Sequence, residues 1–170
     1  MRYFIASDIH GSAHWCRKML ESFERSSADM LVLLGDILYH GPRNDLPDEY
    51  APKEVIELLK PYSDRILCVR GNCDTEVDQM VLDFPLLADY AWLVDDGRRL
   101  FLTHGHKFSP ESLPPLAKGD VFVYGHTHIP VLRQHDDITI LNPGSVSIPK
   151  ENSAHSAVIM ENGEFRFVSL

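Results

Sequence analysis

Short apolar runs alternate with stretches of helical period in the first half of the chain. Residues 2–6, 30–34 and 65–69 are apolar runs of strand length, which predicts three buried strands. Residues 14–25 place apolar side chains at helical spacing, and a second helix is expected near residues 52–60. Strands that alternate with helices are typical of βαβ units, so the three strands are predicted to be parallel and covered by helices.

The second half of the chain predicts hairpins. Its apolar runs pair across short polar turns, and Asn162-Gly163 in the last turn is a strong short-range hairpin signal. Residues 121–124 add one more buried strand. The two halves together predict an α/β fold in which two sheets pack with helices outside, in a single domain over residues 1–170. The expected hairpin partners are residues 91–94 with 99–103, 131–134 with 138–141, and 157–160 with 165–168.

Composition and charge limit the classes of function. The 170 residues carry 16 Lys and Arg against 25 Asp and Glu, a net charge of −9, which argues against a nucleic-acid or anionic-membrane surface. The first apolar run is too short for a signal peptide or a membrane span, and no later run reaches spanning length. The three cysteines lack zinc-type spacing, and their odd number does not suggest a disulfide framework. These features predict a reduced, cytoplasmic location.

Five short polar motifs stand where apolar runs end. In open α/β sheets the loops at the carboxyl ends of strands converge on one crevice, so these motifs are expected to meet. Gly35, Gly71, Gly105 and Gly125 permit the sharp turns and close backbone approach that such a site requires. The motifs are Asp8-Ile9-His10, Gly35-Asp36, Gly71-Asn72-Cys73-Asp74, His104-Gly105-His106 and Gly125-His126-Thr127-His128.

The motifs together offer two Asp, one Asn and four His side chains as candidate metal ligands. Each motif alone has an ordinary interpretation as a turn or a helix N-cap, but the ordered set predicts two divalent cations. Oxygen and nitrogen donors suit Mn²⁺, Fe²⁺, Zn²⁺ or Co²⁺ better than a structural cysteine-rich zinc site. A carboxylate can bridge two cations, and two-metal sites catalyse phosphoryl transfer to water.

These motifs resemble the signature of the calcineurin-like metallophosphoesterase superfamily. Within it, the chain is most similar to the small bacterial YfcE-type phosphodiesterases, a branch that also includes the retromer subunit of similar fold. Further similarity lies in His40-Gly41-Pro42-Arg43-Asn44 and Asn142-Pro143-Gly144-Ser145. The resemblance covers nearly the whole chain and implies a four-layer α/β/β/α sandwich with two packed mixed sheets.

The resemblance also implies a ligand set and a reaction. A metal-bound hydroxide would attack the phosphorus of a small phosphate diester, in line with the departing alcohol. Mn²⁺ is the expected ion, and Fe²⁺, Zn²⁺, Co²⁺ or Ni²⁺ are alternatives. One ion would be held by Asp8, His10, Asp36 and His128, and the other by Asp36, Asn72, His104 and His126, with Asp36 as the bridge.

One position departs from the pattern of many relatives. Cys73 stands where they carry a His that stabilises the transition state or protonates the leaving group, and a thiol is a poor replacement for an imidazolium. The chain is therefore expected to favour good leaving groups or to use another acid, for which Asp74, His106 and Arg43 are candidates. Arg43 has two further interpretations, as a bidentate phosphate ligand or as part of a surface turn.

Two other functions remain open on the sequence alone. One is a non-catalytic protein-binding scaffold on the same fold, and the other is a phosphomonoesterase. The complete set of seven ligands favours an enzyme over a scaffold, and Cys73 weakens the monoesterase alternative. The expected partner is a small phosphate ester, with no membrane and no nucleic acid, and a homo-oligomer remains open.

Overall fold

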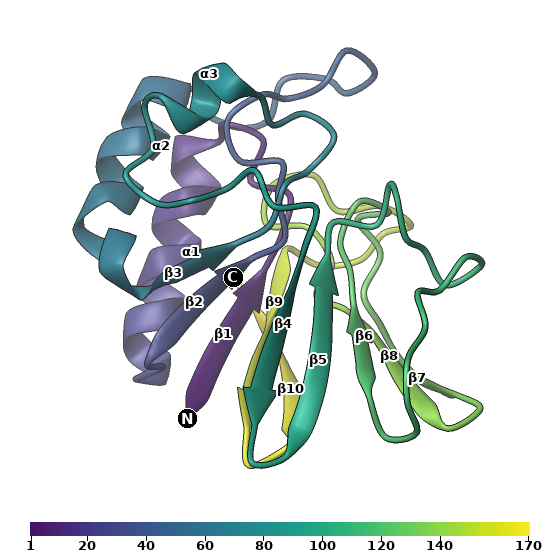
Figure 1. Ribbon diagram of the computed structural model, residues 1–170. Coiled ribbons are helices and arrows are strands. Elements are labelled where there is room, and N and C mark those ends of the chain that lie inside the picture. Colours follow the sequence, from purple (N-terminus) through teal and green to yellow (C-terminus); the bar gives the residue numbers. More distant parts are fainter.

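Two five-stranded β-sheets lie against each other, and helices cover one of them (Figure 1). The computed structural model describes all residues from Met1 to Leu170. In chain order the elements are β1 (Arg2–Ala6), α1 (Ala13–Ser26), β2 (Met30–Leu33), α2 (Pro52–Leu59), the 3₁₀ helix η1 (Lys60–Arg65), β3 (Ile66–Cys68), α3 (Glu76–Gln79), β4 (Tyr90–Asp95), β5 (Arg98–Thr103), β6 (Val121–Val123), β7 (Val131–His135), β8 (Ile138–Asn142), β9 (Ser156–Glu161) and β10 (Glu164–Ser169).

Both sheets are mixed, as predicted. The first has the order β10-β9-β1-β2-β3, in which β1, β2 and β3 are parallel and β9 runs antiparallel to β1. The second has the order β4-β5-β6-β8-β7, in which β5, β6 and β8 are parallel. The three expected hairpins are β4–β5, β7–β8 and β9–β10. The predicted α/β class with two mixed sheets is therefore confirmed.

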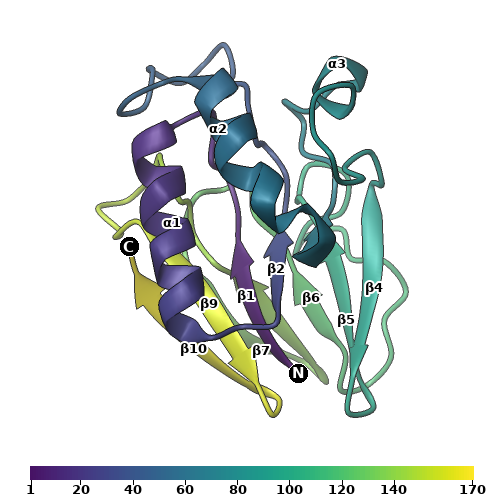
Figure 2. The same ribbon diagram turned by 90° about the vertical axis from the view of Figure 1, so that its left-hand side faces the viewer.

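The two longer helices lie side by side on the outer face of the first sheet (Figure 2). The Ser12 hydroxyl caps α1 by accepting a hydrogen bond from the Trp15 N–H at 3.2 Å, which satisfies one of the free donors at the helix start. Pro52 begins α2, where its missing N–H leaves no partner unsatisfied. The ring of Phe23 on α1 meets Phe4 of β1 edge to face, with centroids 5.9 Å apart.

No helix is long and apolar enough to cross a membrane.

The outer face of the second sheet is covered differently from what the four-layer expectation implies. Residues 104–120 form this layer and contain no helix, although Phe108, Leu113 and Leu116 pack on the apolar side chains of the sheet. Three prolines and two glycines interrupt this segment. Proline removes a helix donor and disfavours helical backbone in the residue before it, so the fourth layer is an irregular chain.

The core between the sheets fixes the positions of the strand ends. Twelve buried side chains fill it, among them Ile5 and Leu34 from the first sheet region and Leu102 and Val123 from the second. The carboxyl ends of β1, β2 and β3 share one edge of their sheet, and those of β5, β6 and β8 share one edge of theirs. Figure 1 shows that β1 and β5 point the same way. The loops after these strands are therefore brought together.

Shortening a side chain in this core should weaken the whole fold. Leu102→Ala removes a fully buried side chain, and we expect it to lower the free energy of unfolding by about 2–5 kcal/mol. Val94→Ala on the exposed side of β4 is the control, since Val94 is 61% exposed and its loss should cost no more than about 0.5 kcal/mol. Urea denaturation measures both, and equal midpoints for the two variants would contradict this assignment of the core.

Candidate metal centre

Five of the predicted ligands have left-handed backbone. This conformation costs a non-glycine residue on the order of 1–2 kcal/mol, and such strain persists where the surrounding structure enforces it, often at functional sites. In the loops after β1 and β6 two residues with positive φ are separated by one residue without it. These are Asp8 and His10 around Ile9, and His126 and His128 around Thr127. The φ values are 62° at Asp8, 49° at His10, 56° at Asp36, 64° at His126 and 62° at His128.

The first ligand group joins the loop after β1 to the loop after β6. Nδ1 of His10 lies 2.8 Å from the carbonyl oxygen of Tyr39, and Nδ1 of His128 lies 2.6 Å from that of Ile148. Because a carbonyl only accepts hydrogen bonds, each Nδ1 carries the hydrogen. In the neutral ring, Nε2 then carries a lone pair and can bind a cation. The two Nε2 atoms lie 3.3 Å apart. Asp8 Oδ1 lies 3.6 Å from Nε2 of His10 and 3.3 Å from Nε2 of His128.

The Asp8 carboxylate has an unusual environment. It is completely buried, and no hydrogen-bond donor reaches Oδ1. Burial alone would raise the pKa of Asp8, but its contacts with His10 and His128 hold that pKa well below its usual range. Its other oxygen, Oδ2, accepts a hydrogen bond from the His126 N–H at 3.1 Å, but a buried carboxylate oxygen without a donor is costly unless a cation compensates it. Three acceptor atoms that converge in this way fit a divalent cation with mixed oxygen and nitrogen ligands.

Asp36 lies between the two ligand groups. Its Oδ1 accepts a hydrogen bond from the Cys73 N–H at 2.8 Å. Its Oδ2 lies 3.6 Å from Nε2 of His10 and 3.4 Å from Nε2 of His104. Burial alone would raise the pKa of Asp36, but the interactions with His104 and His10 together lower it. One oxygen is thus oriented by the backbone, and the other faces ligands from both groups, as a bridging carboxylate requires.

The second ligand group contains His104, Asn72 and His126. His104 donates from Nδ1 to the Leu34 carbonyl at 2.7 Å, and its Nε2 lies 3.0 Å from Asn72 Oδ1. The ring centroids of His104 and His126 are 5.0 Å apart. Burial alone would lower the pKa of His104, but the Asp36 and Asp8 carboxylates raise it to about 9. All seven residues predicted as ligands therefore meet at one site.

Asp74 lies beneath the ligands instead of facing the substrate. Its carboxylate is 1% exposed and accepts three backbone hydrogen bonds, from Asp36 at 2.8 Å, Ile37 at 2.9 Å and Gly71 at 2.7 Å. Burial raises the pKa of Asp74, and these hydrogen bonds act in the opposite direction. The carboxylate thus holds the loop after β2 against the loop after β3.

Two of the motif glycines are required by close contacts. A Cβ atom on Gly71 would lie 2.1 Å from Asp36 Oδ1. A Cβ atom on Gly125 would lie 2.0 Å from Ser7 Oγ and 2.9 Å from Asp8 Oδ2. The close backbone approach expected from the sequence is therefore present beside both carboxylates.

The segment after β8 supports the ligand loops, which sequence reasoning did not anticipate. The hydroxyls of Ser145 and Ser147 donate to the carbonyl oxygen of Asp8 at 3.0 and 3.1 Å. The Asn142 amide donates to the carbonyl of Gly125 at 2.8 Å. The sequence contained Asn142-Pro143-Gly144-Ser145 as a motif, but its role depends on how β8 returns beside β1 and β6.

A cavity of about 460 Å³ opens over the ligands. Arg43 and Cys73, both predicted, line it. Thr127 and Asn44, which belong to the motifs but had been given no role, line it as well, and Lys150 lines it although no motif contains it. His106 does not line this cavity; its ring centroid lies 5.5 Å from that of His104 and 6.3 Å from that of His126. The lining is completed by His10, Asp36, Gly41, Pro42, Asn72, His126 and His128.

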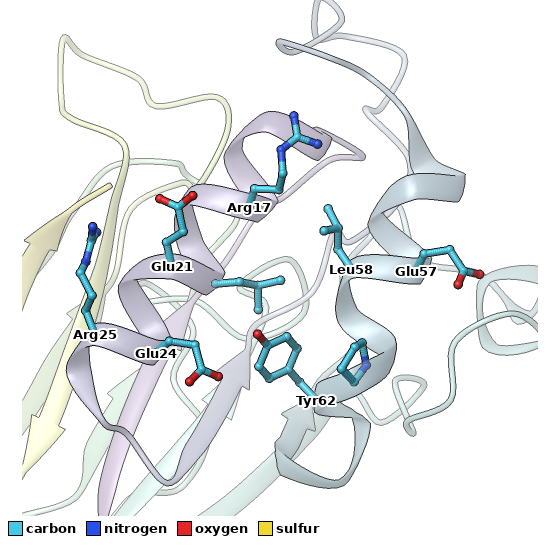
Figure 3. A pocket seen from close by; sticks show the side chains of 9 residues that line it. Arg17, Glu21, Glu24, Arg25, Glu57, Leu58 and Tyr62 are labelled. Atoms are coloured by element: carbon cyan, nitrogen blue, oxygen red, sulfur yellow. The ribbon is translucent and has the colours of Figure 1, made fainter.

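A larger hollow of about 630 Å³ lies between α1 and the α2–η1 segment (Figure 3). Arg17, Glu21 and Glu24 border it from α1, and Leu58 and Tyr62 border it from the other side. None of the predicted site residues lines it. Size alone therefore does not identify the functional cavity, and the ligand geometry does.

Comparison with known proteins agrees with this geometry. Residues 1–164 match the calcineurin-like phosphoesterase superfamily domain. The chain belongs to this superfamily. Phosphodiesterase YfcE of Escherichia coli K12 is 50% identical over 170 residues, which cover 100% of this chain and 92% of YfcE. The solved structure of E. coli YfcE, described as a phosphoesterase, matches with a TM-score of 0.97 and covers 99% of this chain and 93% of that chain.

More distant proteins are also similar to the chain. Phosphodiesterase MJ0936 of Methanocaldococcus jannaschii is 26% identical over 152 residues, covering 85% of this chain and 83% of its own. Vps29 of Chaetomium thermophilum is 17% identical with a TM-score of 0.66 over 94% of this chain and 81% of that chain, which shows a common fold. The predicted membership of this phosphoesterase superfamily is confirmed, and the chain is a homologue of YfcE.

Removing the charge of Asp74 should loosen the ligand loops. Asp74→Asn replaces one acceptor oxygen by a donor amide that faces backbone N–H groups. We expect the free energy of unfolding to fall by about 1–3 kcal/mol, and the melting temperature of a chain of this size to fall by roughly 2–4 °C per kcal/mol. Asp45→Asn, at an exposed carboxylate, is the matched control. Calorimetry that shows the same melting temperature for both variants would contradict the supporting role.

Metal binding should release protons. With its pKa raised to about 9, His104 of the metal-free protein carries a proton at pH 7 that must leave before Nε2 can bind a cation. A proton competes more strongly at lower pH, so Mn²⁺ affinity should rise about tenfold per pH unit between pH 6.5 and 8.5. Titration calorimetry in two buffers of different ionisation enthalpy counts the released protons. Equal heats in both buffers, with an affinity independent of pH, would contradict this.

Proposed function

We propose that this protein is a phosphodiesterase that hydrolyses small phosphate diesters with two divalent cations, Mn²⁺ being the preferred ion. The observation that carries the proposal is the position of Asp36 Oδ2, within 3.6 Å of the Nε2 atoms of both His10 and His104. Once His104 has lost its proton, three buried acceptor atoms face one another here, and bound cations would compensate them. The 50% identity to a protein named a phosphodiesterase supports the same activity.

The proposed ligands divide into two sets that share Asp36. Asp8, His10 and His128 would hold one cation, and Asn72, His104 and His126 the other. When bound, the cations act as Lewis acids on a phosphate oxygen and lower the pKa of water. The chain orients the ligands: backbone carbonyls fix the tautomers of His10, His104 and His128, so that each Nε2 faces the site.

Arg43 and Lys150 are the proposed phosphate-binding residues. Both side chains line the cavity over the ligands and are the only Lys or Arg residues that do so. A guanidinium can bind two phosphate oxygens at once, whereas an ammonium acts as a point charge. The two together can hold an anionic ester whose phosphorus faces the ligand cluster.

The leaving alcohol is proposed to depart without an acid from the cavity wall. Burial and the nearby Asp36 raise the pKa of the Cys73 thiol, which makes it a weak acid. Burial and the neighbouring His104 lower the pKa of His106, so its ring is neutral near pH 7. The Asp74 carboxylate is occupied by backbone donors. These features favour diesters of acidic alcohols, which leave without protonation.

A cytoplasmic location is also proposed. Cys16, Cys68 and Cys73 are all free thiols, and free cysteines are typical of a reducing compartment.

Paired nitrophenyl esters test the proposed function. After chelation and addition of Mn²⁺, we expect kcat/KM for bis(4-nitrophenyl) phosphate to exceed that for 4-nitrophenyl phosphate by about tenfold or more, and both rates to vanish with chelator. Asp36→Ala should lose roughly 100-fold or more in kcat/KM, together with bound Mn²⁺ measured by mass spectrometry of the metal.

Asp45→Ala, at an exposed carboxylate in the loop that also carries Arg43, controls for nonspecific effects and should keep both activity and metal. The proposal fails if chelation leaves the rates unchanged, if the monoester is the better substrate, or if the Asp36 variant keeps full activity.

A further inference from the structure

A second, apolar hollow adjoins the cavity over the metal ligands. It has a volume of about 330 Å³ and lies between the loop after β2, the start of α2 and α3. Two of its side chains are exposed to solvent in spite of their apolar character, Tyr39 by 42% and Val77 by 66%. We call it the Tyr39 groove; its apolar lining is Leu38, Tyr39, Tyr50, Pro52, Cys73 and Val77.

Cys73 connects the groove to the metal ligands. Its side chain lines both hollows, and its Sγ lies within 4.8 Å of the ligand atoms of His10 and Asp36. The connection is also made through the backbone, because the carbonyl of Tyr39 accepts the hydrogen bond that orients His10. Cys73 is therefore the point at which the groove and the cavity over the ligands adjoin.

The charges of the two hollows differ. The cavity over the ligands contains Arg43 and Lys150, whereas no Lys or Arg lines the groove. The one charged residue of the groove is Asp78, whose Oδ2 accepts hydrogen bonds from the N–H and hydroxyl of Thr75 at 2.6 and 3.0 Å. An anionic phosphate is thus favoured in the cavity and disfavoured in the groove, which suits an uncharged group.

Resting on the phosphodiesterase function proposed above, we propose that the Tyr39 groove is the subsite for one ester substituent of the substrate, and that this substituent is a planar aromatic ring. The groove offers two tyrosine rings. An aromatic ring that stacks on them, or meets them edge to face, gains more binding free energy than the burial of its apolar area alone provides. His40 holds both tyrosines, with ring centroids 4.8 Å from Tyr39 and 5.1 Å from Tyr50. The volume lies at the lower end of the ~300–1,000 Å³ usual for small-molecule sites, which fits one ring system.

Two diesters with the same leaving group test the subsite. Methyl 4-nitrophenyl phosphate and phenyl 4-nitrophenyl phosphate both release 4-nitrophenolate, and they differ only in the second substituent. With the Mn²⁺-loaded protein, we expect KM for the phenyl ester to be about tenfold lower than for the methyl ester. Titration calorimetry with diphenyl and dimethyl phosphate gives a second readout, in which diphenyl phosphate should bind about tenfold more tightly.

Substitutions in the groove should reduce this preference. We expect Val77→Ser and Tyr39→Ala to lower the phenyl-to-methyl ratio of kcat/KM, and the ratio of the two binding constants, by about fivefold. The Tyr39 variant keeps the backbone carbonyl that His10 requires, and its Mn²⁺ content is measured to verify this. Val81→Ser is the matched control: Val81 is 45% exposed close to α3 but does not line the groove, so its ratios should equal those of the unmodified protein.

The outcomes separate the subsite from the phosphodiesterase function. Ratios near one in the unmodified protein, or ratios that the two groove variants leave unchanged, would overturn the aromatic subsite while ester hydrolysis itself stood. If neither diester is hydrolysed with Mn²⁺ but diphenyl phosphate binds preferentially and loses that preference in the groove variants, the subsite stands and the proposed function fails.

Discussion

The structure depends on a buried site in which several hydrogen-bond acceptor atoms face one another without hydrogen-bond donors between them. The Asp8 carboxylate is fully buried with Oδ1 unpartnered, and the Nε2 lone pairs of His10 and His128 face each other across 3.3 Å. Buried polar groups normally find hydrogen-bond partners, so a group of acceptors aimed at one point requires something positive between them. This requirement explains why the hydrogen bonds around the site end on the backbone and on Nδ1 atoms. The Nδ1 atoms of His10, His104 and His128 are used in this way, and their Nε2 atoms are directed at the site.

The two sheets have to meet closely for this arrangement to exist. Asp8 and Asp36 belong to loops of the first sheet, whereas His104, His126 and His128 belong to loops of the second. Gly125 of the second sheet lies closer to Ser7 and Asp8 than a Cβ would permit. Within the first sheet, Gly71 and the Asp74 carboxylate hold the loops after β2 and β3 together. The inter-sheet core sets the separation of the strand ends, and the ligand distances follow from it.

The strands, the hairpins and the set of ligand residues could be predicted from the sequence, because they depend on local patterns. Apolar runs that end in polar motifs predicted the strands and the convergence of all seven ligand residues, and turn residues such as Asn162-Gly163 predicted the hairpins. What could not be read depends on contacts between distant segments. Asp74 looked like a candidate acid until its three backbone donors were visible, and Lys150 reaches the cavity only because of the path between β8 and β9. The irregular fourth layer could have been anticipated, since the prolines between residues 104 and 120 are plain in the sequence.

The backbone strain shows how strongly function constrains this fold. Five ligand residues have positive φ. At about 1–2 kcal/mol for each, their total cost of about 5–10 kcal/mol is comparable to the roughly 5–15 kcal/mol by which a whole domain is usually stable. Asp and His both adopt this conformation more readily than most residues, so all five lie at the lower end of that cost. The remaining cost has to be offset by packing between the sheets, by the hydrogen bonds from Ser145 and Ser147, and by cations that bind only the folded chain, whose contribution grows with the logarithm of their concentration. Without cations, it is the packing of the surrounding strands that holds the ligands in this strained geometry.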